Sequence, residues 1–233
     1  MESMRDRGGR RRAPEPPKKP AKILLVEDHP LMREAMAERL KSATDFEIGG
    51  EAAGVRQALN FLTEVEFTAA VIDIALPDGN GLDLIRRMSR EFPAVRTLAF
   101  SMYDEEVYGV RAIQAGASGY LNKHEPSVKL TEALRTIIRG DYFVSASLGQ
   151  KLIGMQSEGS RNGFAGDESC LSDRELEIYG LIGEGLATRE IAERLHLSVH
   201  TIDTHREHMK KKLGNLTGNE LNRSAILWRV ENA

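Results

Sequence analysis

Five polar residues each follow an apolar run of this chain, and their types suit chemistry on a phosphoryl group. Glu27 and Asp28 follow KILLV, and Asp73 follows AAVI. Ser101 follows RTLAF, and Lys123 follows SGYLN. Carboxylates bind hard divalent cations, a carboxylate can accept a phosphoryl group, and ammonium or hydroxyl groups can bind its oxygens. Each residue alone is uninformative, because an Asp after a strand usually caps a turn or a helix, but the joint pattern favours a site.

The residue types also suggest separate roles. We expect Asp73 to be the nucleophile that forms an aspartyl phosphate. Lys123 would pair with one phosphoryl oxygen, and Ser101 would donate a hydrogen bond to another.

A divalent cation is expected beside these groups. Asp28 and Asp73 are expected ligands, Glu27 is expected as a direct or water-mediated one, and the backbone carbonyl of Ala75 would complete the set. Clustered carboxylates raise one another's pKa unless a cation is present. The sequence therefore predicts a site for Mg²⁺ (or Mn²⁺).

Alternating strands and helices must position these residues. Five strand–helix repeats predict an α/β fold with a doubly wound, five-stranded parallel sheet of the flavodoxin type. In such a sheet the carboxyl ends of the strands form the site. We expect strands at 22–27, 47–52, 69–74, 96–101 and 118–122, and helices at 31–43, 54–64, 80–91, 104–115 and 127–139.

Composition divides the chain into segments. Its 233 residues are comfortable for two domains. Residues 1–21 form a basic Pro/Gly-rich tail that we expect to be disordered; it could touch nucleic acid or membrane, but a solubilising extension is the simpler interpretation. Residues 22–140 form the α/β domain, 141–168 a linker that includes a helix, and 169–233 a helical domain.

Several features point to the cytoplasm and away from membranes. The chain has no apolar run of the ~20 residues that a membrane span needs. It has no apolar segment typical of a secretory signal, and Cys170 is its single cysteine.

The last segment predicts four helices that include a helix–turn–helix. Capping boxes at Ser172 and Thr217 start the first and fourth helices. The second covers Thr188–Leu195, and the third begins after Ser198. The residues expected on the buried faces of the middle two helices are Ile191, Ala192, Leu195, Val199, Ile202, Met209 and Leu213.

The third helix carries a polar face that fits a DNA major groove. Spacing alone leaves a simple solvated four-helix module as an equal alternative, and the nearly neutral charge of 169–233 argues against strong nonspecific DNA binding. The candidate contacts are His200, Thr201, Asp203, Thr204, Glu207, Lys210, Lys211 and Lys212.

The motifs VEDH, VIDIALPDGNG, FSMYDE and GYLNK together resemble the receiver domain of bacterial two-component response regulators. This resemblance implies that a histidine kinase phosphorylates Asp73. It also implies a switch in which Ser101 moves to the phosphoryl group and Tyr120 turns inward. Ala75 and Tyr103 would tune dephosphorylation. The domain would assist its own Mg²⁺-dependent phosphorylation and dephosphorylation without being an enzyme otherwise.

The segment LSDRELEIYGLIGEGLATREIAERLHLSVHTIDTHREHMKKKLG resembles the LuxR-type DNA-binding domain of NarL/FixJ response regulators. It implies a cytoplasmic bacterial transcription regulator, which dimerises on promoter DNA when phosphorylated and has RNA polymerase as a further candidate partner. Asp203, Thr204 and Glu207 stand where members of this family usually contact base edges. Thr201, Lys211 and Lys212 stand where they usually contact phosphates. Asp203 and Glu207 are unusually acidic here, and we expect Arg206 to pair with one of them.

The resemblance also supplies expectations about regulation. In some family members the unphosphorylated receiver covers the recognition helix, which we expect here too. Ile226, Leu227 and Trp228 are a candidate dimer surface, although core packing is equally open for Trp228.

Two other classes of protein remain as weaker alternatives. A phosphatase of the haloacid dehalogenase type also uses a strand-end Asp with Mg²⁺, but it would want an acid where Ala75 stands. An interaction adaptor that has lost DNA binding would explain the acidic Asp203 and Glu207. Turnover of phosphate esters tests the first alternative, and salt-dependent binding of selected and random DNA tests the second.

Overall fold

The computed structural model describes residues 19–157 and 167–231. Most of the expected tail at 1–21 and the Gly/Ser-rich part of the expected linker, residues 158–166, lie outside the described residues. Among the described residues, no helix is long and apolar enough to cross a membrane.

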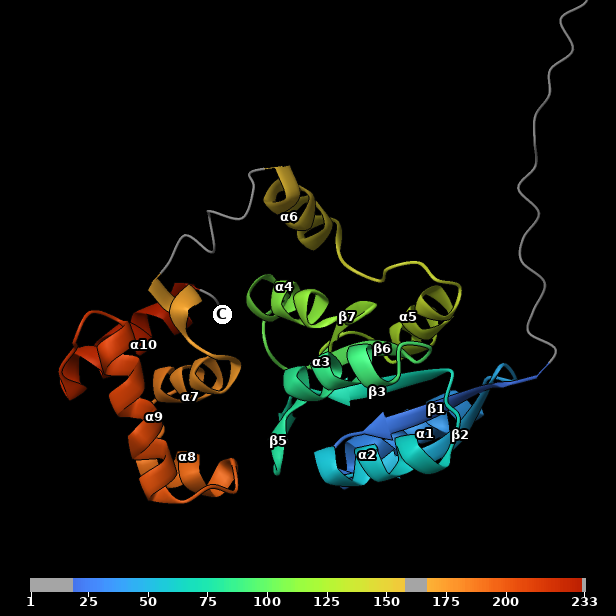
Figure 1. The fold of residues 1–233 in the computed structure, drawn as a ribbon, viewed down its shortest axis with the longest axis horizontal. Helices are drawn as coiled ribbons and strands as arrows, with labels where there is room; N and C mark the ends of the chain where they lie inside the picture. The colour runs from blue at the N-terminus through green and yellow to red at the C-terminus, as the bar shows by residue number, and fades with distance from the viewer. Residues whose placement is uncertain (1–18, 158–166, 232–233) are drawn as a thin grey trace, which may run out of the picture.

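A five-stranded parallel sheet forms the centre of the N-terminal part (Figure 1). Its strand order is β2-β1-β3-β6-β7, which confirms the doubly wound α/β fold expected from the sequence. All five residues of the central β3 are buried, as an apolar run covered on both faces requires. The strands are β1 (Ala21–Val26), β2 (Phe46–Ala52), β3 (Ala69–Asp73), β6 (Arg96–Ser101) and β7 (Gly119–Asn122).

Helices cover both faces of this sheet, and two separate apolar clusters fill the layers. On one face lie α1 (Pro30–Lys41) and α5 (Val128–Ile138). On the other lie α2 (Val55–Glu64), α3 (Gly81–Glu91) and α4 (Glu105–Ala115). We call the unit from β1 to α5 the sheet domain.

A short hairpin follows β3, where the sequence indicated only a turn. It pairs β4 (Ala75–Leu76) with β5 (Gly79–Asn80) in antiparallel fashion. Helix α3 starts directly after it, because the Asn80 side chain accepts a hydrogen bond from the Leu82 amide at 2.8 Å. A Cβ atom at Gly81 would lie 2.0 Å from the Asp73 carbonyl oxygen. Glycine therefore lets α3 begin right beside Asp73.

Four helices form the C-terminal part, which we call the helical domain: α7 (Asp173–Gly183), α8 (Thr188–Arg194), α9 (Val199–Lys212) and α10 (Gly218–Glu231). Ser172 and Glu175 form the expected capping box at the start of α7. Of the seven residues expected to be buried in α8 and α9, Val199 is 44% exposed. It is the first residue of α9, and only the following turns reach the core.

The segment between the domains begins against the sheet domain. The expected linker helix is α6 (Ala146–Ser157), which lies over α4 (Figure 1). Leu148 of α6 is buried and packs close to Gly109 of α4. A Cβ atom added at Gly109 would lie 2.6 Å from the Leu148 side chain. A short 3₁₀ helix (Asp167–Cys170) leads into α7.

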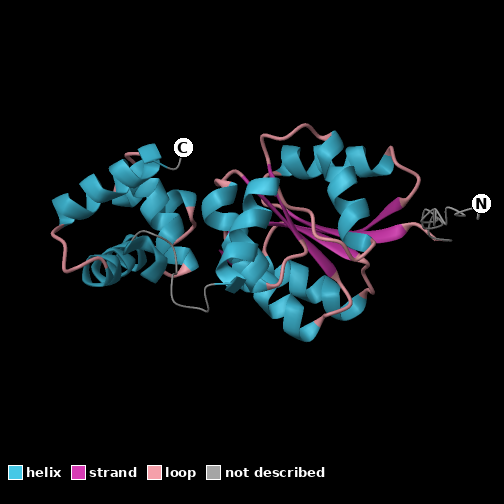
Figure 2. Ribbon diagram, turned by 90° about the horizontal axis from the view of Figure 1, so that it is seen from above, coloured by secondary structure: helices cyan, strands magenta, loops and turns pink. Residues whose placement is uncertain are grey.

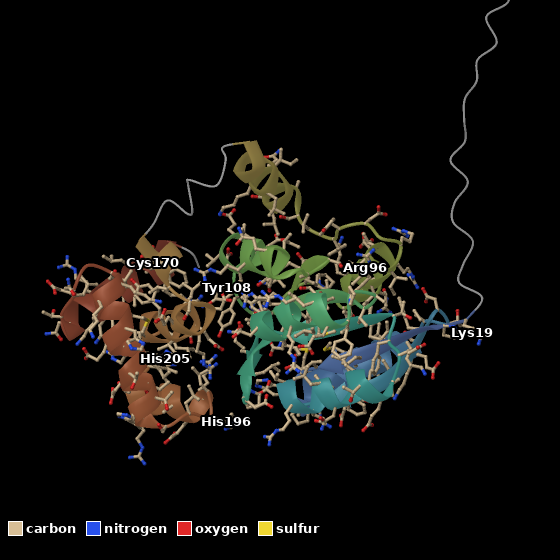
Figure 3. The ribbon with its side chains drawn as sticks, in the orientation of Figure 1. Lys19, Arg96, Tyr108, Cys170, His196 and His205 are labelled. Carbon is tan, nitrogen blue, oxygen red and sulfur yellow. The ribbon has the colours of Figure 1, made fainter. Side chains whose placement is uncertain are left out.

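The two domains lie side by side, with α7 of the helical domain near α3 and α4 of the sheet domain (Figures 1 and 2). Tyr108 of α4 lies on the side of the sheet domain that faces the helical domain (Figure 3). One apolar cluster runs continuously from α3 and α4 into the core of the helical domain.

Candidate phosphoacceptor site and DNA interface

The five polar residues singled out by the sequence gather at the carboxyl edge of the sheet. Glu27 and Asp28 follow β1, Asp73 ends β3, Ser101 ends β6, and Lys123 follows β7. Asp73 is only 3% exposed, and Glu27 and Ser101 are buried as well. The parallel register of neighbouring strands brings these residues together from positions up to 96 apart in the sequence.

Lys123 bridges two buried carboxylates. Its Nζ lies 2.8 Å from Asp73 Oδ2 and 2.7 Å from Glu27 Oε2. Burial alone would lower the pKa of Lys123, but the two carboxylates outweigh it and hold the pKa above its usual value. The lysine is therefore a permanent cation at this edge of the sheet.

The Asp73 carboxyl has a strongly shifted pKa. Burial, supported by the charge on Glu27, raises the pKa of Asp73 to about 7 against the opposing effect of Lys123. A second bond comes from the Ala75 amide, which donates to Asp73 Oδ1 at 3.2 Å. Because it is buried, this carboxylate is weakly solvated, and weak solvation favours its use as a nucleophile once positive charge is close.

The acidic groups at the end of β1 fit a hard cation. Ligand atoms of Glu27, Asp28 and His29 all lie within 4.8 Å of one another. Glu27 Oε2 is buried and, apart from its ion pair with Lys123, accepts no hydrogen bond from the described residues. Oxygen ligands of this kind suit Mg²⁺. Asp73 lies outside this tight group, although the sequence placed it among the ligands.

His29 was not among the site residues predicted from the sequence. Its exposed ring lies 2.9 Å, by Nδ1, from Asp28 Oδ1. The only signal for it was its position directly after two acidic residues.

The Ala75 carbonyl, which the sequence predicted as a further ligand, lies in the β4–β5 hairpin. The neighbouring backbone hydrogen bond, donated by the Gly81 amide, goes to the Ile74 carbonyl and not to that of Ala75.

Ser101 and Tyr120, the two residues of the expected switch, both form hydrogen bonds with the backbone of Tyr103. The Tyr103 amide donates to Ser101 Oγ at 3.2 Å, and the Tyr120 hydroxyl donates to the Tyr103 carbonyl at 2.7 Å. Asn122 donates to the same carbonyl at 3.0 Å. Tyr120 is already turned inward, with 2% of its surface exposed. Burial raises its pKa, so this hydroxyl stays a donor.

The helical domain contributes to the walls of a pocket over Asp73. A cavity of about 100 Å³ lies over Asp73, and Arg194 and Leu195 of the helical domain line it. No sequence pattern indicated this, because it depends on how the two domains pack. The other lining residues are Asp28, His29, Ala75, Leu76, Pro77, Ser101, Met102, Tyr103 and Lys123.

Asp173 is clamped between two arginines of the sheet domain. Arg86 of α3 and Arg111 of α4 donate to its two carboxylate oxygens at 3.0 and 2.9 Å. Arg111 also donates to the Leu171 carbonyl at 3.0 Å. These charge-assisted bonds fix the start of α7 against the sheet domain.

Glu177, one turn further along α7, is completely buried between the domains. It accepts hydrogen bonds from Arg174 at 2.6 Å, from Asn80 at 3.3 Å and from the Tyr103 hydroxyl at 3.4 Å. Burial raises the pKa of Glu177 against these three bonds. The Tyr103 ring is stacked on Tyr108 with centroids 4.4 Å apart.

The polar face of α9 is open to solvent in this arrangement. His200, Asp203, Thr204, Glu207 and Lys211 are exposed. The expectation that the sheet domain covers this helix is therefore wrong, because α7 and the end of α8 make the described polar contacts and line the pocket instead.

Some cationic groups of α9 already have partners. Lys210 donates to Glu207 and Lys212 to Glu175, each at 2.6 Å. The remaining candidate, Thr201, helps to cap α9, since its amide donates to Ser198 Oγ at 3.0 Å.

Arg206 does not pair with Asp203 or Glu207, so that expectation is also wrong. Its Nη2 donates to Asn222 Oδ1 of α10 at 2.8 Å. Asn222 of the neighbouring helix offers Arg206 an acceptor, and Glu207 already forms an ion pair with Lys210.

Of the residues in the candidate dimer surface, Trp228 is partly buried and packs against the core of the helical domain. Its ring lies 5.6 Å from that of Tyr179. Ile226 and Leu227 are 47% and 54% exposed.

The fold and site together define a two-component response regulator that has a receiver domain and a LuxR-type helix–turn–helix domain. Residues 23–135 match the response regulator receiver domain family, and residues 169–221 match the bacterial regulatory proteins of the luxR family. The chain belongs to this family of DNA-binding transcription regulators.

Individual relatives agree with this assignment. The oxygen regulatory protein NreC of Staphylococcus aureus is 32% identical over 197 residues, which cover 83% of this chain and 91% of NreC. The structure of RcsB from Salmonella enterica serovar Typhimurium bound to promoter rprA with the phosphomimetic BeF₃⁻ is similar at a TM-score of 0.59 and 22% identity, covering 88% of this chain and 97% of RcsB. Another Salmonella typhimurium RcsB structure has a TM-score of 0.63 and 21% identity, with 90% and 98% covered. These two structures are similar in fold.

Proposed function

We propose that a histidine kinase phosphorylates Asp73 and that the phosphorylated protein dimerises on promoter DNA to regulate transcription. The observation that carries this proposal is the buried Asp73 carboxylate, which Lys123 holds at 2.8 Å beside the acidic pair Glu27 and Asp28. Residues 22–140 would form the receiver domain, 141–168 the linker and 169–233 the DNA-binding domain, all acting in the cytoplasm.

The phosphotransfer step uses groups of this chain that are already in place. A carboxylate oxygen of Asp73 forms a bond to phosphorus as the bond from phosphorus to the kinase histidine nitrogen breaks, and that nitrogen keeps the electron pair. Lys123 then pairs with one phosphoryl oxygen, and Ser101 donates a hydrogen bond to another. Water would later attack the same phosphorus, the bond from phosphorus to the Asp73 oxygen would break, and inorganic phosphate would leave as Asp73 regains its free carboxylate. Ala75 and Tyr103 line the pocket through which this water would approach.

The acidic pair would hold the metal ion. Glu27, Asp28, Asp73 and the Ala75 carbonyl offer the hard oxygen ligands that Mg²⁺ or Mn²⁺ takes. The bound cation would neutralise charge on the phosphoryl oxygens.

The switch would act through Ser101 and Tyr120. Ser101 Oγ accepts from the Tyr103 amide, interacts with the Tyr120 side chain, and carries a hydroxyl proton that it would donate to a phosphoryl oxygen. Tyr120 fixes the other side of the same residue through its carbonyl. A change at the phosphoryl group would therefore shift Tyr103.

The DNA contacts proposed for α9 follow from its exposed face. Asp203, Thr204 and Glu207 would reach base edges, where an acidic group accepts from the cytosine amine. His200, Thr201, Lys210, Lys211 and Lys212 would lie near phosphates. A solved structure described as two RcsB dimers bound to two parallel DNAs, at a TM-score of 0.55, supports binding as a dimer. RNA polymerase is the further partner that we propose.

Selection from a random-sequence duplex pool tests the proposal. The full chain is incubated with Mg²⁺ and acetyl phosphate, and the isosteric Asp73→Asn variant is treated in the same way. We expect the wild type to enrich a motif with two half-sites and the variant to enrich it weakly. Equal enrichment by both proteins would refute phosphorylation control, and no enrichment by either would favour an interaction adaptor.

A further inference from the structure

The helical domain lies over the pocket of Asp73 and leaves α9, the proposed DNA-recognition helix, exposed to solvent. Arg194 and Leu195 line the cavity above Asp73, while the polar face of α9 faces solvent. The cavity of about 100 Å³ has room for small groups only. A donor larger than such a group would meet Arg194 and Leu195 at the wall of this cavity.

Two acidic residues of α7 hold the domains together. The Asp173 carboxylate forms ion pairs with Arg86 at 3.0 Å and with Arg111 at 2.9 Å, and its side chain is 12% exposed. Glu177 is fully buried and accepts from Asn80 and Tyr103 of the sheet domain. Charge-assisted bonds of this kind are directional and fix one docked geometry.

The same contacts lead back to the switch. The peptide groups of Tyr103 are bound by Ser101 and Tyr120, and its hydroxyl touches Glu177 of the helical domain. Tyr103 therefore contacts Ser101 at the carboxyl edge of the sheet through its amide and Glu177 of the helical domain through its hydroxyl.

We propose that the docked helical domain is a gate over Asp73: the Asp173 clamp and the buried Glu177 hold it closed, and it must swing away before a phosphoryl donor can enter. This gate regulates access to the acceptor rather than access to DNA, and it rests on the proposed phosphorylation of Asp73. Because only the open form admits the donor, a protein that is open for a larger fraction of the time is phosphorylated faster.

The double variant Arg86→Ala/Arg111→Ala tests the gate, because it removes both arms of the clamp and none of the phosphoacceptor residues. Arg87→Ala is the matched control: it is the neighbouring arginine of α3, and its partner is the exposed Glu91 at 2.9 Å. Full-length proteins are incubated with Mg²⁺ and acetyl phosphate, which releases acetate as Asp73 gains the phosphoryl group. Intact mass gives the rate, and small-angle scattering gives the radius of gyration before phosphorylation.

We expect the double variant to have a larger radius of gyration than the wild type and to be phosphorylated roughly fivefold faster or more. Arg87→Ala should match the wild type in both measurements. An unchanged radius would refute the clamp, and a larger radius with an unchanged rate would refute the gate, while both leave the proposed function standing. If no protein gains a phosphoryl group, the proposed function fails together with the gate.

Discussion

At the scale of single residues, Lys123 supplies the positive charge that two buried carboxylates share. It lies within 2.8 Å of both Asp73 and Glu27. Removing one partner of a buried ion pair typically costs about 3 to 5 kcal/mol, because the charge left behind has no compensation. We predict that Lys123→Ala lowers the free energy of unfolding by about 3 kcal/mol without Mg²⁺, and by clearly less with saturating Mg²⁺, because the cation restores positive charge.

Urea unfolding with and without Mg²⁺ measures this difference. Lys129→Ala is the control, since its ion pair with Glu132 at 3.1 Å is exposed and should contribute between 0 and about 1 kcal/mol. If Mg²⁺ leaves the loss in Lys123→Ala unchanged, the metal site does not lie beside these carboxylates.

The candidate site could be predicted from single residues because each one ends a strand. Asp73, Ser101 and Lys123 follow buried apolar runs, and parallel strands bring such positions to one edge. His29 and Arg194 could not be predicted in the same way. The first is exposed and follows no pattern of its own, and the second reaches the pocket only through domain packing.

At the scale of elements, the capping box of α7 links a local sequence signal to stability. Glu175 accepts from the Ser172 amide and from Lys212, at 2.7 and 2.6 Å. Burial alone would raise the pKa of Glu175, but these bonds outweigh it and hold the pKa below 4.5. Because the unfolded state takes up the proton more readily, this contribution is complete above pH 4.5 and is lost as the pH falls through the lower folded-state pKa.

We predict that Glu175→Gln destabilises the helical domain by about 1 kcal/mol at pH 7 and by progressively less as the pH falls below 4.5. Trp228 is the only tryptophan of the chain and packs on Tyr179, so its fluorescence in urea reports unfolding of this domain. A difference between the two proteins that stays constant down to acid pH would show that the charge of Glu175 contributes nothing.

The longer elements were predictable because their patterns extend over several turns or residues. The strands and helices of the sheet domain match their expected positions within two residues. The β4–β5 hairpin was not predictable, because two-residue strands carry no period. Val199 fitted the apolar pattern of α9, but its place in the first turn leaves it exposed.

At the scale of the whole molecule, the domain arrangement is what the sequence could not give. The clamp joins Asp173 to Arg86 and Arg111, which lie 87 and 62 residues away and sit on otherwise ordinary helix faces. The resulting packing leaves α9 exposed, so the proposed phosphorylation of Asp73 has no recognition helix to uncover. We therefore expect any gain in DNA affinity to come from the proposed dimerisation.

We predict that phosphorylation leaves affinity for a duplex with one half-site unchanged within about twofold, and raises affinity for two half-sites by about tenfold or more through effective concentration. Fluorescence anisotropy with the two duplexes, taken from the selected motif, measures both affinities. A phosphorylated protein that also binds the single half-site much more tightly would show that α9 is masked in solution.

The most direct test of this account is the intact mass of the full chain after incubation with Mg²⁺ and acetyl phosphate, with Asp73→Asn as the control. We predict one added phosphoryl group on the wild type, acid-stable and base-labile as an acyl phosphate should be, and none on the variant. An adduct of equal extent on Asp73→Asn, or no adduct on the wild type with this donor, would contradict the assignment of Asp73 as the phosphoacceptor.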